Sequence, residues 1–233
     1  MTERRVAMIT GATGGLGRVL APDLAADGWD LALVGSSAER LNGLVDELGL
    51  EPERIIAVVA NLREQRAAVT AIDAAYERFG RVDALAHLVG GWTGGMHVGR
   101  SPDDPYRDMI DQHFWTSLNV VRELVPRMVE AGFGRIAAVS SPMAAQPDAG
   151  MSAYGVGKAA QETLFAALAQ EVANTGVTVN VVRVRAIDTA AGESGSGKAY
   201  ATTPAEISAA LRYLFSDAAR VVNGQHIGLH NGV

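Results

Sequence analysis

The chain has 233 residues, of which 48% are hydrophobic, with a net charge of −6 and no cysteine. This size and apolar content suit a single α/β domain over residues 1–233, while the acidic balance gives no basic surface for nucleic acid. The absence of cysteine excludes disulfides and thiolate metal sites. No apolar run approaches the roughly 18 residues of a membrane span and none leads as a signal peptide would, so we expect a cytoplasmic protein.

Apolar runs and helical patterns alternate along the chain. Runs typical of buried parallel strands occur at Val6–Thr10, Leu31–Val34, Ile55–Val59, Val82–Val89, Arg135–Ser140, Val177–Val182 and His226–Leu229. Helical patterns occur at Arg18–Ala26, Arg63–Phe79, Asp104–Ala131 and Ser152–Thr175. Pro126 could kink the third of these helices. The alternation predicts right-handed crossovers and a doubly wound parallel sheet of about seven strands, with helices on both faces.

The first strand leads into a glycine-rich turn, Gly11-Ala12-Thr13-Gly14-Gly15-Leu16-Gly17. Glycines let the backbone turn tightly and approach a pyrophosphate, whose charge meets the helix N-terminus. Glycine also serves ordinary turns, but a cluster between the first strand and the first helix favours a nucleotide-binding loop. Ligands of open α/β sheets bind beyond the carboxyl ends of the strands. The glycine turn and Ser141 both follow strands directly, so both reach that edge.

Tyr154 and Lys158 lie four residues apart, on one face of a predicted helix. Lys158 is one of two lysines in a chain with eighteen arginines, which suggests that an arginine would not serve there. A nearby cation lowers the pKa of a tyrosine from about 10 toward the operating pH that acid–base catalysis requires. The same spacing also fits an ordinary neighbour pair on a solvated helix.

Taken together, these motifs resemble the short-chain dehydrogenase/reductase family over essentially the whole chain. The family's Thr-Gly-x-x-x-Gly-x-Gly spacing is carried by Thr10, Gly11, Gly15 and Gly17. Ser141 has the spacing of the family's substrate-orienting serine, and Asn223-Gly224-Gln225 resembles the segment before its last strand. The resemblance implies a Rossmann-type fold. It also implies an NAD(P)(H)-dependent oxidoreductase that transfers a hydride between nicotinamide and a carbonyl/alcohol or cyclic C=N substrate.

The resemblance implies a role for each matching residue. Tyr154 would be the general acid/base, Lys158 would lower its pKa and bind the nicotinamide ribose, and Ser141 would polarise the substrate carbonyl. Ser140 is the adjacent alternative, and the other interpretation of Ser141 is a serine that only ends a strand. Implied cofactor contacts are Gly11, Thr13, Gly14, Gly15, Leu16, Gly17, Ser36, Ser37, Asn61, Leu62, Gly90, Tyr154, Lys158, Ile187 and Thr189. A substrate lid is implied around residues 190–203.

Four positions depart from the family pattern. His87-Leu88-Val89-Gly90 stands for Asn-Asn-Ala-Gly, His113 for the helix asparagine, Asn61 for an adenine-contacting Asp, and Val184-Arg185 for Pro-Gly. His113 could relay protons because the pKa of histidine lies near neutrality, or it could be a core or surface histidine. These departures leave a non-redox nucleotide-binding regulator or a lyase on the same scaffold as the alternative function.

A second likeness concerns residues 89–95 and 114–117, which are similar to the dihydropteridine reductase branch. That branch also lacks the helix asparagine, whereas Ser141 and the full glycine pattern are similar to the ordinary reductases. Trp92 and Trp115 fit either an aromatic substrate slot or core packing.

Cofactor choice depends on the end of the second predicted strand. NAD-preferring enzymes place a carboxylate there, but Gly35-Ser36-Ser37 has none, and Ser36, Ser37 and Arg40 could bind a 2′-phosphate. Thr13 instead favours NAD(H), because NADP enzymes often carry a basic residue at its position. We expect NADP(H), with NAD(H) as the alternative. By family likeness we expect a homodimer or homotetramer acting on a small-molecule substrate, without nucleic acid or membrane.

Overall fold

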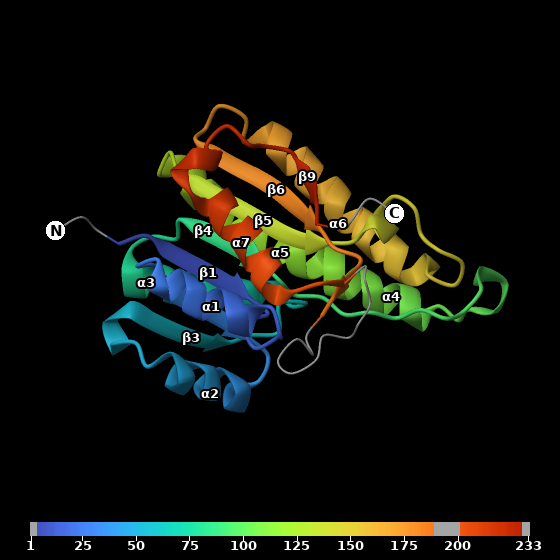
Figure 1. Ribbon diagram of the computed structural model, residues 1–233, viewed down its shortest axis with the longest axis horizontal. Helices are drawn as coiled ribbons and strands as arrows, with labels where there is room; N and C mark the ends of the chain where they lie inside the picture. The colour runs from blue at the N-terminus through green and yellow to red at the C-terminus, as the bar shows by residue number, and fades with distance from the viewer. Residues whose placement is uncertain (1–3, 189–200, 230–233) are drawn as a thin grey trace.

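The structure is a computed structural model that describes residues 4–188 and 201–229. Seven parallel strands form one sheet in the order β3-β2-β1-β4-β5-β6-β9 (Figure 1). The strands are β1 (Val6–Thr10), β2 (Asp30–Gly35), β3 (Ile55–Val59), β4 (Ala84–His87), β5 (Gly134–Ser140), β6 (Val177–Arg183) and β9 (His226–Gly228). The predicted fold class, a Rossmann-type α/β sheet with all strands parallel, is confirmed.

Helices cover both faces of the sheet, because side chains alternate along each strand. In β1, Ala7 and Ile9 enter one apolar cluster, while Val6 and Met8 enter the other. The helices of the first cluster are α1 (Gly17–Ala26), α2 (Ala38–Leu48) and α7 (Pro204–Phe215). Those of the second are α3 (Gln65–Phe79), α5 (Thr116–Glu130) and α6 (Ser152–Glu171). In Figure 1, α1 and α7 lie in front of the sheet, with α5 and α6 behind it.

The helix predicted over Asp104–Ala131 is interrupted. It consists of α4 (Asp104–Ile110), the π-helical turn η3 (Asp111–Trp115) and α5. Pro126 lies within α5, so the break comes upstream of the residue expected to cause it. The hydroxyls of Thr116 and Ser117 donate to the carbonyls of Gln112 and His113, both at 2.6 Å. These bonds satisfy carbonyls at the wider turn, where His113 is fully buried.

Several element boundaries differ from the predicted ones. Strand β4 is shorter at both ends than Val82–Val89. Helix α6 ends at Glu171 rather than Thr175, and the left-handed residues Asn174 (φ 66°) and Gly176 (φ 85°) turn the chain into β6. Beyond β6, a small parallel pair joins β7 (Ala186–Ile187) to β8 (Ala201–Thr202). None of the helices in the described ranges is long and apolar enough to cross a membrane.

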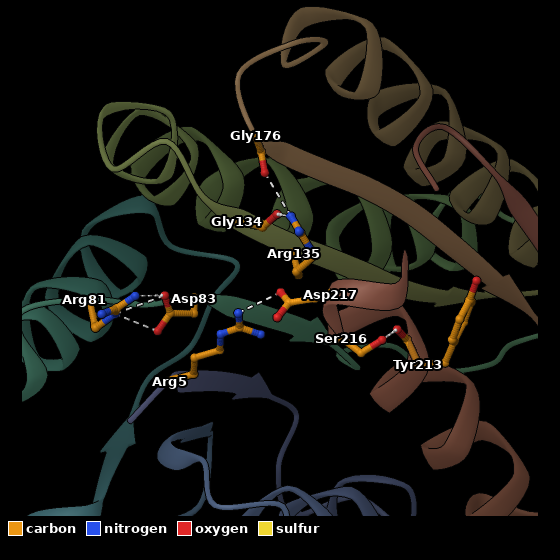
Figure 2. A network of polar contacts seen from close by, with 9 residues as sticks. All are labelled: Arg5, Arg81, Asp83, Gly134, Arg135, Gly176, Tyr213, Ser216 and Asp217. Atoms are coloured by element: carbon orange, nitrogen blue, oxygen red, sulfur yellow. Dashed lines mark hydrogen bonds and ion pairs between the residues drawn. The ribbon is translucent and has the colours of Figure 1, made fainter. Parts of the chain in front are cut away.

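A polar network closes the amino edge of the sheet, opposite the glycine turn (Figure 2). The buried carboxylate of Asp83 accepts the Val6 N–H at 2.8 Å and a guanidinium N–H of Arg81 at 2.6 Å. On β5, Arg135 donates to two carbonyls, while Arg5 pairs with Asp217 at 2.7 Å. This edge therefore ties strands and loops together and leaves the carboxyl edge for ligands.

The two carboxylates of this network are expected to differ in their contribution to stability. Asp83→Ala should lower the free energy of unfolding by about 2–4 kcal/mol. It leaves the Val6 N–H without an acceptor and removes the buried carboxylate that pairs with Arg81. The side chain of Asp217 is 71% exposed, so Asp217→Ala should cost no more than about 1 kcal/mol. Denaturant unfolding would measure both, and equal losses would contradict the assignment.

Candidate active site

Two cavities meet at the glycine turn, on the carboxyl edge of the sheet. The first has a volume of about 480 Å³, and the predicted residues that line it are Gly11, Gly14, Gly15, Leu16, Gly17, Gly90, Tyr154, Lys158 and Ile187. The second has a volume of about 290 Å³, and the predicted residues that line it are Gly11, Thr13, Gly14, Ser36, Asn61, Leu62 and Gly90. The structure therefore gathers most of the predicted cofactor contacts around one loop.

The glycine turn fits a closely approaching ligand because side chains are excluded from it. Gly11 has a φ of 71°, and a Cβ there would lie 3.0 Å from the backbone of Leu88. A Cβ on Gly17 would lie 2.3 Å from the carbonyl oxygen of Ala12. The backbone of the glycine turn thus borders both cavities, and Gly17 at the start of α1 lines the first, as a loop that cradles the pyrophosphate of a dinucleotide requires.

Tyr154 is half-buried in the first turn of α6 and hydrogen-bonds the side chain of Ser141. Its ring meets the ring of His113 edge-on, with centroids 5.6 Å apart. Burial raises the pKa of Tyr154 above its ordinary value, and the hydrogen bond from Ser141 opposes that rise. The direction differs from the predicted one, because desolvation of the phenolate dominates. The phenol is therefore held protonated at neutral pH.

Lys158 lies one helical turn after Tyr154 on α6 and is buried, and its ammonium group has hydrogen-bond partners within the protein. Nζ donates to the carbonyl of Val139 at 2.8 Å and to Oε1 of Gln161 at 3.0 Å. Nε2 of Gln161 donates in turn to the hydroxyl of Ser117 at 3.0 Å. Burial lowers the pKa of Lys158 to about 7, although the charge of Glu162 opposes that fall. Gln161 was not among the predicted site residues, although residues 154, 158 and 161 share one helical face.

Burial of Lys158 predicts a stability that depends on pH. Its folded pKa of about 7 lies below its ordinary 10.5, so folding favours the neutral amine. The resulting penalty is fully present below pH 7 and fades as pH rises toward 10.5, where the unfolded chain also loses the proton. From pH 7 to 9, the unfolding free energy of the wild type should gain about 1 kcal/mol per pH unit relative to Lys158→Met. If denaturant unfolding gave the wild type and Lys158→Met the same dependence of the unfolding free energy on pH, this prediction would be contradicted.

His87 replaces the first asparagine of the family pattern and has a bridging position. Its Nδ1 lies 2.9 Å from the hydroxyl of Thr10 on β1, and its Nε2 lies 3.3 Å from the hydroxyl of Thr116 on α5. Burial, helped by the charge of Lys158, lowers the pKa of His87 to about 3. The neutral ring therefore links two strands and a helix below the cavities.

Ser141 and Ser37 are predicted site residues that do not line either cavity. Ser141 lies one residue from Ser140, which lines the first cavity, and reaches the site through its bond to Tyr154. Ser37 caps α2, where its hydroxyl accepts the Arg40 N–H at 3.4 Å. Thr189, like the predicted lid residues 190–200, lies outside the described residues.

The two tryptophans are not in the core, so core packing is excluded for both. Trp92 lines the first cavity and is 63% exposed, whereas Trp115 is 42% exposed and meets Phe114 edge-on at 5.2 Å. Asn119 on α5 had no predicted role. Its side-chain amide donates to the carbonyls of Leu62 and Arg63, and so holds α5 against the loop that borders the second cavity.

Known proteins similar to this chain include reductases and an oxidoreductase. The 3-oxoacyl-(acyl-carrier-protein) reductase FabG of Salmonella typhimurium is 26% identical over 242 residues, which cover 99% of this chain and 98% of that protein. The oxidoreductase UcpA of Escherichia coli is 37% identical over 182 residues, covering 76% of this chain and 67% of its own length.

Solved structures share the fold at lower identity. Xylitol dehydrogenase bound to NAD⁺ superposes with a TM-score of 0.87 at 20% identity and covers 100% of both chains. ElxO with NADP bound has a TM-score of 0.88 at 17% identity and covers 97% of each. The sequence profile described as short chain dehydrogenase matches residues 5–198. The chain therefore belongs to the short-chain dehydrogenase/reductase family of NAD(P)-dependent oxidoreductases.

Proposed function

We propose that the protein is an NADP(H)-preferring carbonyl reductase in which Tyr154 is the proton donor. One observation carries this proposal: the hydroxyl of Tyr154, bonded to Ser141, borders the same cavity as Lys158 and the glycine turn. Proton donor, cation and dinucleotide loop are thereby brought together. Family membership also favours redox chemistry over the non-redox alternative.

The chemistry of each side chain follows from its surroundings. A bound reduced nicotinamide supplies the hydride for the substrate carbon. Tyr154, protonated because burial raises its pKa, donates its proton to the carbonyl oxygen, so that hydride and proton together give the alcohol. Ser141, bonded to the same phenol, polarises the carbonyl. The Lys158 ammonium stabilises the phenolate that remains.

The preference for NADP(H) rests on the second cavity. Ser36 and Arg40 line it, and in the part of the chain that the structure describes no carboxylate does. A serine hydroxyl and a guanidinium are donors for a 2′-phosphate, which a carboxylate would repel. The fold itself occurs with either cofactor, since one similar structure holds NAD⁺ and another NADP.

A matched pair of substitutions tests this preference. Ser36→Asp places a carboxylate in the second cavity and should change the ratio of NADPH to NADH affinity at least tenfold toward NADH. Ser37→Asp adds the same charge one residue along, at the cap of α2, where aspartate is also a good cap. We expect a clearly smaller change for this control. Fluorescence titration of the reduced cofactors measures both ratios, and equal effects would contradict the assignment of Ser36.

The reductase activity is tested by following the absorbance of NADPH at 340 nm with a panel of aldehydes, ketones and 3-oxoacyl thioesters. The last class is included because FabG is named for it. We expect consumption of NADPH matched by formation of an alcohol. Saturable binding of NADPH without turnover of any carbonyl compound in the panel would overturn the proposal.

A further inference from the structure

His113 has one ring nitrogen with a partner and one without. Its Nε2 lies 3.1 Å from the carbonyl oxygen of Gly91 and must donate to it, since a carbonyl only accepts. Nδ1 is buried, and no described residue hydrogen-bonds it. A buried polar atom left unpaired is costly, so it usually marks a position that serves a purpose.

The geometry of Gly90 shows what Nδ1 faces. A Cβ on Gly90 would lie 3.1 Å from Nδ1 of His113 and 3.8 Å from Nζ of Lys158. The same Cβ would lie only 2.8 Å from Cε1 of the imidazole, so any side chain there would displace the ring. The missing side chain of Gly90 therefore lets the ring nitrogen and the ammonium approach the same small space beside the first cavity.

When Lys158 is protonated, which its pKa of about 7 allows near and below neutral pH, the two groups are complementary as donor and acceptor. Burial and the charge of Lys158 lower the pKa of His113 to about 3, so the imidazole is neutral at physiological pH. With the proton on Nε2, Nδ1 carries a lone pair and can only accept. An ammonium has three donors, and the two acceptors already bound are Val139 and Gln161. The pKa of His113 therefore lies well below the near-neutral value that the relay hypothesis assumed, and the ring is buried.

We propose that His113 is a positioning residue that acts through Lys158: its Nδ1 accepts a hydrogen bond from one water molecule that in turn accepts from the lysine ammonium. This inference rests on the proposed function, in which Lys158 stabilises the Tyr154 phenolate. This bridge holds the ammonium on the cavity side of Gln161. His113 thereby supports the lysine, with the lone pair of a ring nitrogen as the acceptor.

Nuclear magnetic resonance tests the contact without any substrate. In protein labelled with ¹⁵N-histidine, Lys158→Met should move the His113 Nδ1 resonance toward that of an unbonded imidazole nitrogen. Its Nε2–H tautomer should persist. The charge of Lys158 also acts on His87, whose Nδ1 bonds to Thr10 rather than to the lysine. The smaller shift expected for the His87 resonance therefore measures the effect of the charge alone. Equal shifts at the two histidines would overturn the proposal, whether or not the protein proves to be a reductase.

Two substitutions separate the two ring nitrogens. Asparagine places an oxygen where Nδ1 lies and loses the bond to Gly91, whereas glutamine keeps a donor toward Gly91 and loses the acceptor. Once an alcohol substrate is known, His113→Gln should lower kcat about tenfold and His113→Asn clearly less. In His113→Gln, the acid limb of alcohol oxidation should also move up by about one pH unit, because a less firmly held ammonium stabilises the phenolate less.

The titratable groups around the ammonium must be the same in His113→Gln and His113→Asn. Glu162 on α6, His87 on β4 and the phenol of Tyr154 all remain in both variants. A larger loss of kcat in His113→Asn than in His113→Gln would mean that His113 only anchors the loop at Gly91. Equal losses without a shift of the acid limb, or wild-type behaviour of both variants, would likewise overturn the proposal. A wild type with no turnover would refute the proposed function and leave the resonance test to decide on His113.

Discussion

Tyr154→Phe is expected to lower kcat by a factor of about 10²–10⁴, because the variant has no group that can protonate the substrate oxygen. Only the hydroxyl is removed. The phenylalanine ring still fits edge-on against His113. The Ser141 hydroxyl loses its bond to the phenol but still accepts the Met143 N–H. The affinity for NADPH should therefore stay within about threefold of the wild type by fluorescence titration.

The control for this variant is Tyr213→Phe. Tyr213 is 49% exposed on α7, in the polar network at the opposite edge of the sheet (Figure 2). It should keep wild-type kinetics. Wild-type turnover by Tyr154→Phe would disprove the role of the phenol, and loss of NADPH binding by that variant would mean that Tyr154 serves mainly to hold the cofactor.

Gly17→Ala is expected to abolish tight cofactor binding. The added methyl group would lie 2.3 Å from the carbonyl oxygen of Ala12 and 2.6 Å from its carbonyl carbon. Both are backbone atoms, so the glycine turn must move away from the start of α1. We expect the Kd for NADPH to rise at least about a hundredfold and the free energy of unfolding to fall by about 2–3 kcal/mol.

A second glycine provides the matched control. Gly43 lies within α2, and no atom lies within 4 Å of a Cβ added there. Gly43→Ala should leave NADPH binding unchanged and raise the free energy of unfolding by about 0.5–1 kcal/mol, because alanine favours helix. Unimpaired NADPH binding by Gly17→Ala would show that the close approach at this turn is not needed by the cofactor.

The strands could be predicted well from the sequence, because buried parallel strands are continuous apolar runs. Val6–Thr10 and Ile55–Val59 have the predicted bounds. The helices were harder. The apolar pattern runs on through η3, since the extra residue of a π turn leaves no local signature that distinguishes it from helix. Helix α7 did carry a start signal that was overlooked, namely the capping box of Thr203 and Glu206 with a proline between them.

In the site, glycine spacing and the Tyr154–Lys158 spacing predicted what lies around the first cavity, because both are local patterns. The sign of the pKa shift of Tyr154 could not be predicted, since burial depends on the whole fold. The hydrogen-bond chain around Lys158 was missed in part for the same reason. Val139, which accepts from Lys158, comes from β5, and Ser117, which accepts from Gln161, comes from α5, so only the packed structure brings them to α6. Ser37 was assigned to phosphate although its hydroxyl caps α2.

The most direct test of the account is a fluorescence titration of the purified protein with NADPH and with NADH. The glycine turn, Ser36 and Arg40 predict saturable binding of both, with NADPH at least about tenfold tighter. Tighter binding of NADH would contradict the phosphate site and leave the reductase proposal standing with the other cofactor. Binding of neither would contradict the central claim, because cavities formed by the glycine turn would then not hold a nicotinamide dinucleotide.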